Sequence, residues 1–358
     1  MDKIVAQQLV EELSEMQRAL CSVIESSRAR DAAALSDVAK DAGGDIIYSI
    51  DVDVEIELIR FCEGWGSRHR FILIAEGLGR DGTRAFPSTT TPDNAEFYLI
   101  VDPIDGTRPL MYDKRSAWSL AAIVANEWRR LPTCDGPASG KPGGGLATCP
   151  APRLRHAIAA CMTELPTSKQ LYSDCLFTIR GRKPALLRRR LDTGEERDVA
   201  FTPSRAATIE HGFAMLSNFF PGGKEIVSAI EEELVRELKG LRADRAVVFA
   251  DQYISSGGQF YELIVGHDRF NGDLRGRMIE RGIPAGAPPG LAAHPYDCCV
   301  ELIAREAGVI ITDLEGRPFD APLDTESPVS WLGYANQSLR ALIEPVMQRL
   351  LRKHGLID

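Results

Sequence analysis

Two aspartates separated by two residues, within the hexapeptide Asp102–Thr107 (DPIDGT), most directly suggest chemistry in this 358-residue chain. The hexapeptide follows the apolar run 98–101, so both carboxylates should leave the end of a strand. Carboxylates this close repel each other and tend to hold a proton unless a cation neutralises them. Oxygen ligands beside Gly106 and the hydroxyl of Thr107 suggest divalent-metal chemistry on a phosphate. An aspartate-rich turn is the structural alternative, because Asp, Pro and Gly are all common in turns.

Three further acidic residues lie at the ends of predicted elements. Glu76 closely follows the apolar run 71–74, Asp297 directly precedes a helix-like stretch, and Asp51 begins another. Carboxylates at converging strand ends could complete a metal site. For Asp51 and Asp297, as for Thr107, the alternative role is to cap the helix that follows.

These residues belong to a longer series of motifs. The series comprises Lys40 with Gly44-Asp45 and Asp51, then Ala75-Glu76, DPIDGT, Tyr296-Asp297 and Glu306-Ala307-Gly308. In this order, and over roughly residues 40–320, the chain resembles the inositol monophosphatase superfamily of Mg²⁺-dependent, lithium-sensitive phosphatases. The resemblance implies a layered α-β-α-β-α sandwich, a homodimer, and an active site between two lobes.

The resemblance also implies a set of metal ligands. Glu76, Asp102 and the backbone carbonyl of Ile104 would bind a first Mg²⁺ ion. Asp102, Asp105 and Asp297 would bind a second, and a weaker third ion would lie near Glu76. Mg²⁺ prefers octahedral oxygen coordination and keeps several waters, which suits this ligand set.

The remaining implied roles concern water and phosphate. Thr107 would accept a hydrogen bond from the attacking water and pass its own proton toward Asp51, which together with Glu76 completes the catalytic set. The backbone N–H groups of Gly106 and Thr107 would hold a phosphate oxygen. The segment 255–258 (SSGG) resembles a helix start on the substrate side of the site.

Periodicity alone predicts a mixed α/β chain with two lobes. We place an α+β lobe carrying Asp51, Glu76 and DPIDGT at residues 1–204, and an α/β lobe carrying Asp297 at residues 205–358. A Pro/Gly-rich stretch, 132–152, should be a loop or hairpin insertion. The predicted helices are 3–34, 51–64, 223–238, 259–265 and 298–307, and the predicted strands include 71–74, 98–101, 117–124, 157–162, 175–180, 185–191, 213–217, 247–250 and 309–312.

Bulk properties limit the partners. A net charge of −9 argues against non-specific binding to nucleic acid or to anionic membranes. No apolar run is long enough to span a membrane, and the N-terminus begins a helical pattern rather than a signal peptide. The eight cysteines show no zinc-type spacing, so we expect reduced thiols in a cytoplasmic protein.

Three departures from the family bear on the metal ions and the substrate. Gly77 follows Glu76 where a second acidic residue is common, which weakens the expectation of a third metal ion. Arg108 follows DPIDGT in place of a small or amide residue, and it could approach a second phosphate or a carboxylate. No acidic residue lies between Gly282 and His294, where inositol-specific members carry one that binds the substrate. The substrate contacts should therefore differ from those of a myo-inositol monophosphatase.

The sequence thus predicts a Mg²⁺-dependent phosphomonoesterase with two or three ions. Its substrate would be a small phosphorylated polyol or sugar, such as an inositol phosphate, fructose bisphosphate or sugar phosphate. A 3′-phosphoadenosine 5′-phosphate nucleotidase is the alternative enzyme. A non-catalytic, partner-binding regulator on the same fold is the alternative from another class, although the retained carboxylates favour catalysis.

Overall fold

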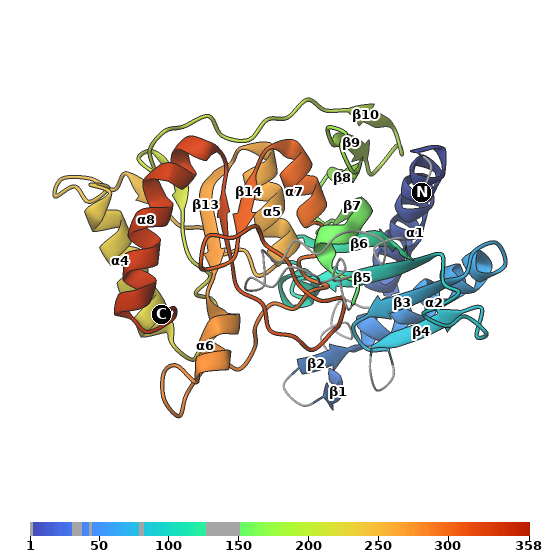
Figure 1. The fold of residues 1–358 in the computed structure, drawn as a ribbon. Helices are drawn as coiled ribbons and strands as arrows, with labels where there is room; N and C mark the ends of the chain where they lie inside the picture. The colour runs from blue at the N-terminus through green and yellow to red at the C-terminus, as the bar shows by residue number, and fades with distance from the viewer. Residues whose placement is uncertain (1–2, 31–37, 43–44, 79–81, 127–150) are drawn as a thin grey trace.

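Two β-sheets with helices between and outside them form the molecule (Figure 1). The computed structural model describes residues 3–30, 38–42, 45–78, 82–126 and 151–358. Most of the predicted loop 132–152 and Gly44 of the motif series lie outside these residues.

An eight-stranded sheet forms the first half, in the order β10-β9-β8-β7-β6-β5-β3-β4. Only β3 and β5 run parallel, and every other neighbouring pair is antiparallel. A short hairpin of β1 (Val38–Ala42) and β2 (Asp45–Tyr48) stands apart from it. The strands are β3 (Phe71–Ala75), β4 (Thr83–Phe86), β5 (Phe97–Asp105), β6 (Ala117–Ala125), β7 (Ala157–Leu165), β8 (Tyr172–Ile179), β9 (Ala185–Arg190) and β10 (Glu196–Asp198).

The central strands of this sheet are buried on both faces. In β6, Trp118 and Leu120 point into one core, whereas Ala121 and Ile123 point into the other. The helices α1 (Lys3–Arg30) and α2 (Ser49–Gly66) cover the second of these faces. Because side chains alternate along a strand, a sheet between two helical layers needs mostly apolar residues on both faces, and β6 is buried at every position and apolar at all of them except Ser119.

A five-stranded sheet forms the second half, in the order β12-β11-β13-β15-β14. The helices α5 and α7 lie between the two sheets, and α4 and α8 lie on the outer face of the second (Figure 1). The strands are β11 (Gly212–Ala214), β12 (Val248–Phe249), β13 (Asp268–Asp273), β14 (Ile310–Thr312) and β15 (Trp331–Tyr334), and the helices are α3 (Thr107–Met111), α4 (Lys224–Glu237), α5 (Ser256–Val265), α6 (Arg275–Arg281), α7 (Glu301–Ala307) and α8 (Gln337–Lys353).

The layers are therefore α1 and α2, the first sheet, α5 and α7, the second sheet, and α4 and α8. This confirms the predicted α-β-α-β-α sandwich of mixed α/β class. The first sheet ends at Asp198 and the second begins at Gly212, and a lobe boundary near residue 205 stays a prediction.

Several predicted bounds were wrong in detail. The helix expected from residue 298 begins at Glu301, because residues 295–300 form consecutive turns. The strands expected at 213–217 and 247–250 are shorter, at 212–214 and 248–249. The elements that were not predicted are β1, β2, β4, β10, β13, β15, α6 and α8.

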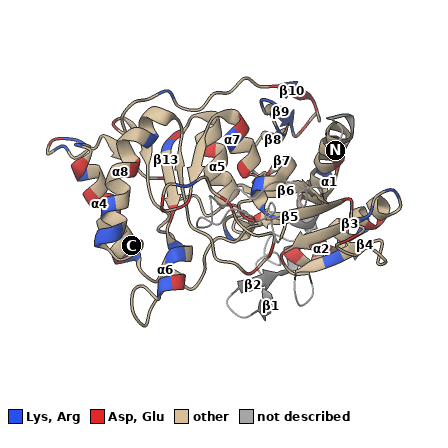
Figure 2. Cartoon of the chain, viewed as in Figure 1, with Lys and Arg blue, Asp and Glu red and all other residues tan. Residues whose placement is uncertain are grey.

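Charges of both signs are mixed along the outer helices (Figure 2). Helix α4 joins α8 through ion pairs, for example between Lys353 and Glu233 at 2.8 Å. Among the described helices, none combines the length and the low polarity that a membrane span requires.

Candidate metal centre

A β-bulge aims both aspartates of the hexapeptide at one point. Asp102 pairs with Leu120 of β6 and Asp105 pairs with Trp118, so three steps along β5 match two steps along β6. On a regular strand, residues three apart point to opposite faces of the sheet. The one extra residue in β5 turns the side chain of Asp105 to the same face as that of Asp102. β-Bulges often re-aim a side chain in this way beside functional sites.

Asp297 reaches these two carboxylates from the other half of the chain. One carboxylate oxygen each from Asp102, Asp105 and Asp297 lie within 4.8 Å of one another. Asp102 and Asp105 are buried, and Asp297 is partly buried. Within the described residues, this is the one cluster of acidic, histidine or cysteine side chains close enough to hold a metal ion.

The three carboxylates repel one another in a dry environment. Burial raises the pKa of Asp102 well above its ordinary value, and repulsion from Asp105, Asp297 and Glu76 raises it further. Burial and repulsion from Asp297 likewise raise the pKa of Asp105, and burial raises that of Asp297. A cation bound between them would relieve this repulsion.

The start of α5 fixes the orientation of Asp105. The Ser255 hydroxyl donates to its carboxylate at 2.8 Å, and the backbone N–H of Gly257 donates to the same oxygen at 2.6 Å. Ser255 also caps α5 by accepting from the N–H of Gly258 at 2.8 Å. The segment 255–258 is thus a helix start beside the site, as predicted, and it contacts a carboxylate of the first half of the chain.

Glu76 is placed beside Asp102 by strand pairing. The parallel strands β3 and β5 align Ala75 with Val101, so the next residue of each strand lies at the same edge of the sheet. Glu76 is exposed and lies outside the tight cluster, although it is near enough to raise the pKa of Asp102. The carboxylates of Asp102, Asp105 and Asp297 therefore lie close together, whereas that of Glu76 lies farther from this cluster.

Thr107 links the hexapeptide to Asp51. Its hydroxyl lies 3.4 Å from the Asp51 carboxylate and 2.9 Å from the carbonyl oxygen of Ile104, and it can donate to one of them at a time. Gly106, with φ of 98°, occupies the N-cap position of α3, so Thr107 is the first helical residue and not the cap. Asp51 lies in the first turn of α2.

Asp297 is held by the residues just before it. The backbone N–H of His294 donates to the Asp297 carboxylate at 2.6 Å. The His294 ring stacks on Tyr296, with ring centroids 5.5 Å apart. The carboxylate that joins the cluster is therefore oriented by its own turn, in the same way that α5 orients Asp105.

Arg275 is a buried support of this region that was not predicted from the sequence. Its guanidinium donates to Asp273 at 2.6 Å and to the carbonyl of Leu291 at 3.1 Å, and it lies 4.6 Å from the ring centre of Phe219. Arg275 thus joins β13 to the loop before Asp297. In the sequence, the only indication of the pair formed by Asp273 and Arg275 is that two opposite charges lie two residues apart.

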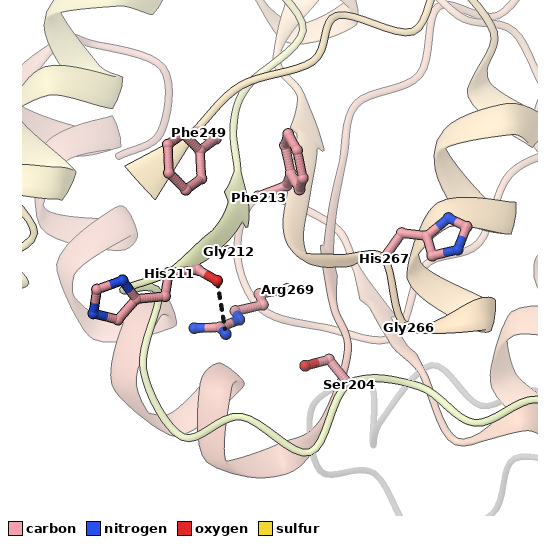
Figure 3. A pocket seen from close by; sticks show the side chains of 8 residues that line it. All are labelled: Ser204, His211, Gly212, Phe213, Phe249, Gly266, His267 and Arg269. Atoms are coloured by element: carbon pink, nitrogen blue, oxygen red, sulfur yellow. Dashed lines mark hydrogen bonds between the residues drawn. The ribbon is translucent and has the colours of Figure 1, made fainter. Parts of the chain in front are cut away.

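A pocket at the edge of the second sheet is a different kind of site (Figure 3). It has a volume of about 470 Å³, and Phe213 and Phe249 lie on its wall. None of its eight lining residues is acidic, so it offers no carboxylate ligand for a metal ion. The candidate centre remains the carboxylate cluster.

Comparison with solved structures agrees with this architecture. The Thermotoga maritima IMPase is 14% identical, covers 95% of this chain and 97% of its own, and has a TM-score of 0.58. The chain has the inositol monophosphatase fold. The extragenic suppressor protein suhB of Bartonella henselae is 12% identical, with coverage of 97% and 99% and a TM-score of 0.58.

A third similar structure is the fructose-1,6-bisphosphatase of Leishmania major in its holo form. It is 12% identical, with coverage of 96% of this chain and 93% of its own and a TM-score of 0.59. No family model and no curated protein sequence matches the chain. The fold that the motif resemblance implied is therefore confirmed.

Proposed function

We propose that the chain is a Mg²⁺-dependent phosphomonoesterase that hydrolyses a small phosphorylated polyol or sugar. The observation that carries this proposal is the cluster of Asp102, Asp105 and Asp297, with carboxylate oxygens within 4.8 Å of one another, on the inositol monophosphatase fold. Buried carboxylates that repel one another are costly unless a cation neutralises them. Their oxygen donors fit Mg²⁺.

The residues that would hold the ions are those the sequence indicated. Glu76, Asp102 and the carbonyl of Ile104 would hold one ion, and Asp102, Asp105 and Asp297 would hold a second. Bound Mg²⁺ would supply Lewis-acid stabilisation of the phosphoryl oxygens. Because Glu76 is exposed and Gly77 adds no carboxylate, a third ion would bind more weakly than the other two.

The chain's own residues would position water and phosphate. Thr107, whose hydroxyl lies 3.4 Å from the Asp51 carboxylate, would orient the attacking water and pass its own proton toward Asp51. Glu76 would assist from the neighbouring strand end. The N–H groups of Gly106 and Thr107 would hold a phosphate oxygen. Arg108, which stacks 5.7 Å from the ring centre of Phe220, would face the rest of the substrate.

The test is phosphate release from a panel of polyol, sugar and nucleotide phosphates, with and without Mg²⁺. We expect Mg²⁺-dependent release from a polyol or sugar phosphate and inhibition by LiCl in the millimolar range. Asp105→Asn should abolish release while leaving the circular dichroism spectrum unchanged, because the amide oxygen can still accept from Ser255 and Gly257.

Two outcomes would replace the proposal. Release only from a nucleoside 3′,5′-bisphosphate would assign the chain as a nucleotidase. Silence across the panel, with Mg²⁺ still raising the melting temperature, would mean either a substrate outside these classes or a metal site kept for structure and partner binding. Light scattering would test the expected homodimer, and localisation to the cytoplasm stays a prediction.

A further inference from the structure

Two cysteine sulfurs lie in contact beneath α1, on the face of the first sheet that points away from the second. Cys161 is on β7 and Cys175 on β8, and their Sγ atoms are 3.7 Å apart. In the antiparallel register Cys175 pairs with Thr163, and Cys161 pairs with Phe177. The two cysteines are therefore diagonal neighbours on one face of the sheet.

The two thiols differ in access. A cavity of about 310 Å³ lies between α1 and strands β8 to β10, and Cys175 lines it whereas Cys161 does not. Cys175 is partly exposed, and Cys161 is fully buried. A small neutral molecule that enters this cavity meets Cys175 first.

Their hydrogen bonds favour a thiolate at the accessible sulfur. The Thr163 hydroxyl lies 3.3 Å from Cys175 Sγ and 2.7 Å from the Gln17 amide oxygen, and it can donate to one of them at a time. A hydrogen bond from the Cys161 thiol lowers the pKa of Cys175, whereas burial raises that of Cys161 well above its usual range. Thiolates, rather than thiols, are the nucleophiles in cysteine oxidation.

We propose that Cys175 and Cys161 form a reversible oxidation site for small peroxides, with Cys175 as the attacking thiol and Cys161 as the resolving thiol. Two observations support this proposal. The two sulfurs are 3.7 Å apart, and of the two cysteines only Cys175 lines the cavity. The inference is independent of the phosphatase proposal.

The chemistry balances in two steps. The Cys175 thiolate attacks one oxygen of hydrogen peroxide, the O–O bond breaks, and hydroxide leaves, which gives a sulfenic acid at Cys175. The Cys161 sulfur then attacks the Cys175 sulfur, the S–O bond breaks, and its thiol proton leaves with the hydroxyl group as water. Two thiols are oxidised to one disulfide, and one peroxide is reduced to two waters in total.

The disulfide should be easily reduced. A disulfide bond is about 2.05 Å long, so the sulfurs must approach one another, and diagonal positions on a sheet are farther apart than directly opposed ones. A strained bond has a more oxidising potential and is labile to thiols. Gln17 of α1 binds both the carbonyl of Cys161, at 3.0 Å, and the Thr163 hydroxyl, at 2.7 Å, so α1 is anchored directly beside the cysteine pair.

Peptide mapping by mass spectrometry tests this directly. Trypsin should release Cys161 in the peptide 156–169 and Cys175 in the adjacent peptide 170–180. After treatment of the full-length protein with equimolar hydrogen peroxide and alkylation, we expect these two peptides cross-linked in most molecules. The cross-link should disappear with dithiothreitol.

Three variants complete the experiment. Cys161→Ser should accumulate a sulfenic acid at Cys175 that dimedone traps, and Cys175→Ser should leave Cys161 reduced. Cys21→Ser is the matched control, because Cys21 lines the same cavity, and it should form the cross-link like the wild type. The proposal fails if both wild-type peptides stay separate after peroxide, or if the cross-link joins Cys21 instead.

Discussion

At the scale of single residues, the three clustered aspartates are oriented by neutral donors. Asp105 accepts from Ser255 and Gly257, Asp102 accepts from the N–H of Ile104 at 3.0 Å, and Asp297 accepts from the N–H of His294. Across the described part of the chain, His294 is the one basic side chain within ion-pair distance of these carboxylates. Their negative charge is therefore left for a bound cation.

Replacing Asp297 with asparagine should have opposite effects with and without metal. In EDTA the variant should be more stable than wild type by roughly 1–2 kcal/mol, because one repelling charge is removed while an acceptor for His294 remains. The rise in melting temperature caused by Mg²⁺ should be lost. Thermal denaturation in EDTA and in Mg²⁺ measures both, and a variant that Mg²⁺ stabilises as strongly as wild type would exclude Asp297 as a ligand.

The role proposed for Thr107 depends on its hydroxyl. Thr107→Val removes that group at constant shape, so kcat should fall by about 10²-fold or more if it handles the proton of the attacking water. Thr107→Ser is the control and should retain most of the activity. Equal losses in the two variants would instead indicate that the methyl group and its packing matter.

At the scale of elements, the start of α5 connects the halves of the molecule at the candidate centre. A Cβ atom on Gly257 would lie 2.5 Å from the side chain of Leu120 and 3.0 Å from the carboxylate of Asp105. A Cβ atom on Gly106 would lie 2.9 Å from the carbonyl of Ile254. Both glycines allow the end of β5 and the start of α5 to approach closely.

Gly257→Ala should therefore destabilise the protein by about 1–3 kcal/mol and weaken Mg²⁺ binding, because overpacking displaces Asp105. Gly64→Ala is the matched control, since Gly64 lies within α2 and its Cβ would meet no atom within 4 Å. This control should be stabilised by roughly 0.5–1 kcal/mol, the usual gain in a helix interior. Urea denaturation of both variants compares them, and equal effects would contradict the close approach of α5.

The sequence predicted the acidic residues that cluster better than it predicted the framework around them. The proposed ligands Asp102 and Asp105 belong to one short motif, so their proximity could be predicted locally. The common direction of their side chains could not be predicted, because it depends on the bulge that the pairing of β5 with β6 creates. Strand β13 (DRFNGD) was missed because its buried positions include Asn271 and Asp273, which hides the apolar pattern of a strand.

Other misses have simpler causes. Helix α8 places Leu339, Ile343 and Met347 on one buried face at helical spacing, and this pattern alone would have predicted it. Strand β15 has only four residues, too few for alternation to be recognised. The role of Arg275 depends on contacts between segments far apart in the chain.

At the scale of the whole molecule, a buried acid group outside the candidate centre should contribute to how stability changes with pH. Burial raises the pKa of Asp268, at the start of β13, to about 7, and repulsion from Glu262 and Asp251 adds to this. Hydrogen bonding from Asn271 and the charge of His267 oppose the shift. In the unfolded chain an aspartate has a pKa of 3.8.

Between pH 4 and 7, approximately, the folded protein thus binds more protons at Asp268 than the unfolded chain, so stability falls as the pH rises through this window. Asp268→Asn should be more stable than wild type at pH 8, by up to about 4 kcal/mol, and this difference should shrink toward pH 4. Urea denaturation at pH 5 and pH 8 measures it. A difference that does not change with pH would place the pKa of Asp268 near its unfolded value.

The positions of the three clustered carboxylates along the chain also determine when their site can form during folding. Asp102 and Asp105 belong to the first sheet, whereas Asp297 follows most of the second sheet along the chain. Contacts between such distant positions form only after a large loop is closed. A ribosome would release most of the chain before the binding site exists, so metal capture would mark the final docking of the two halves.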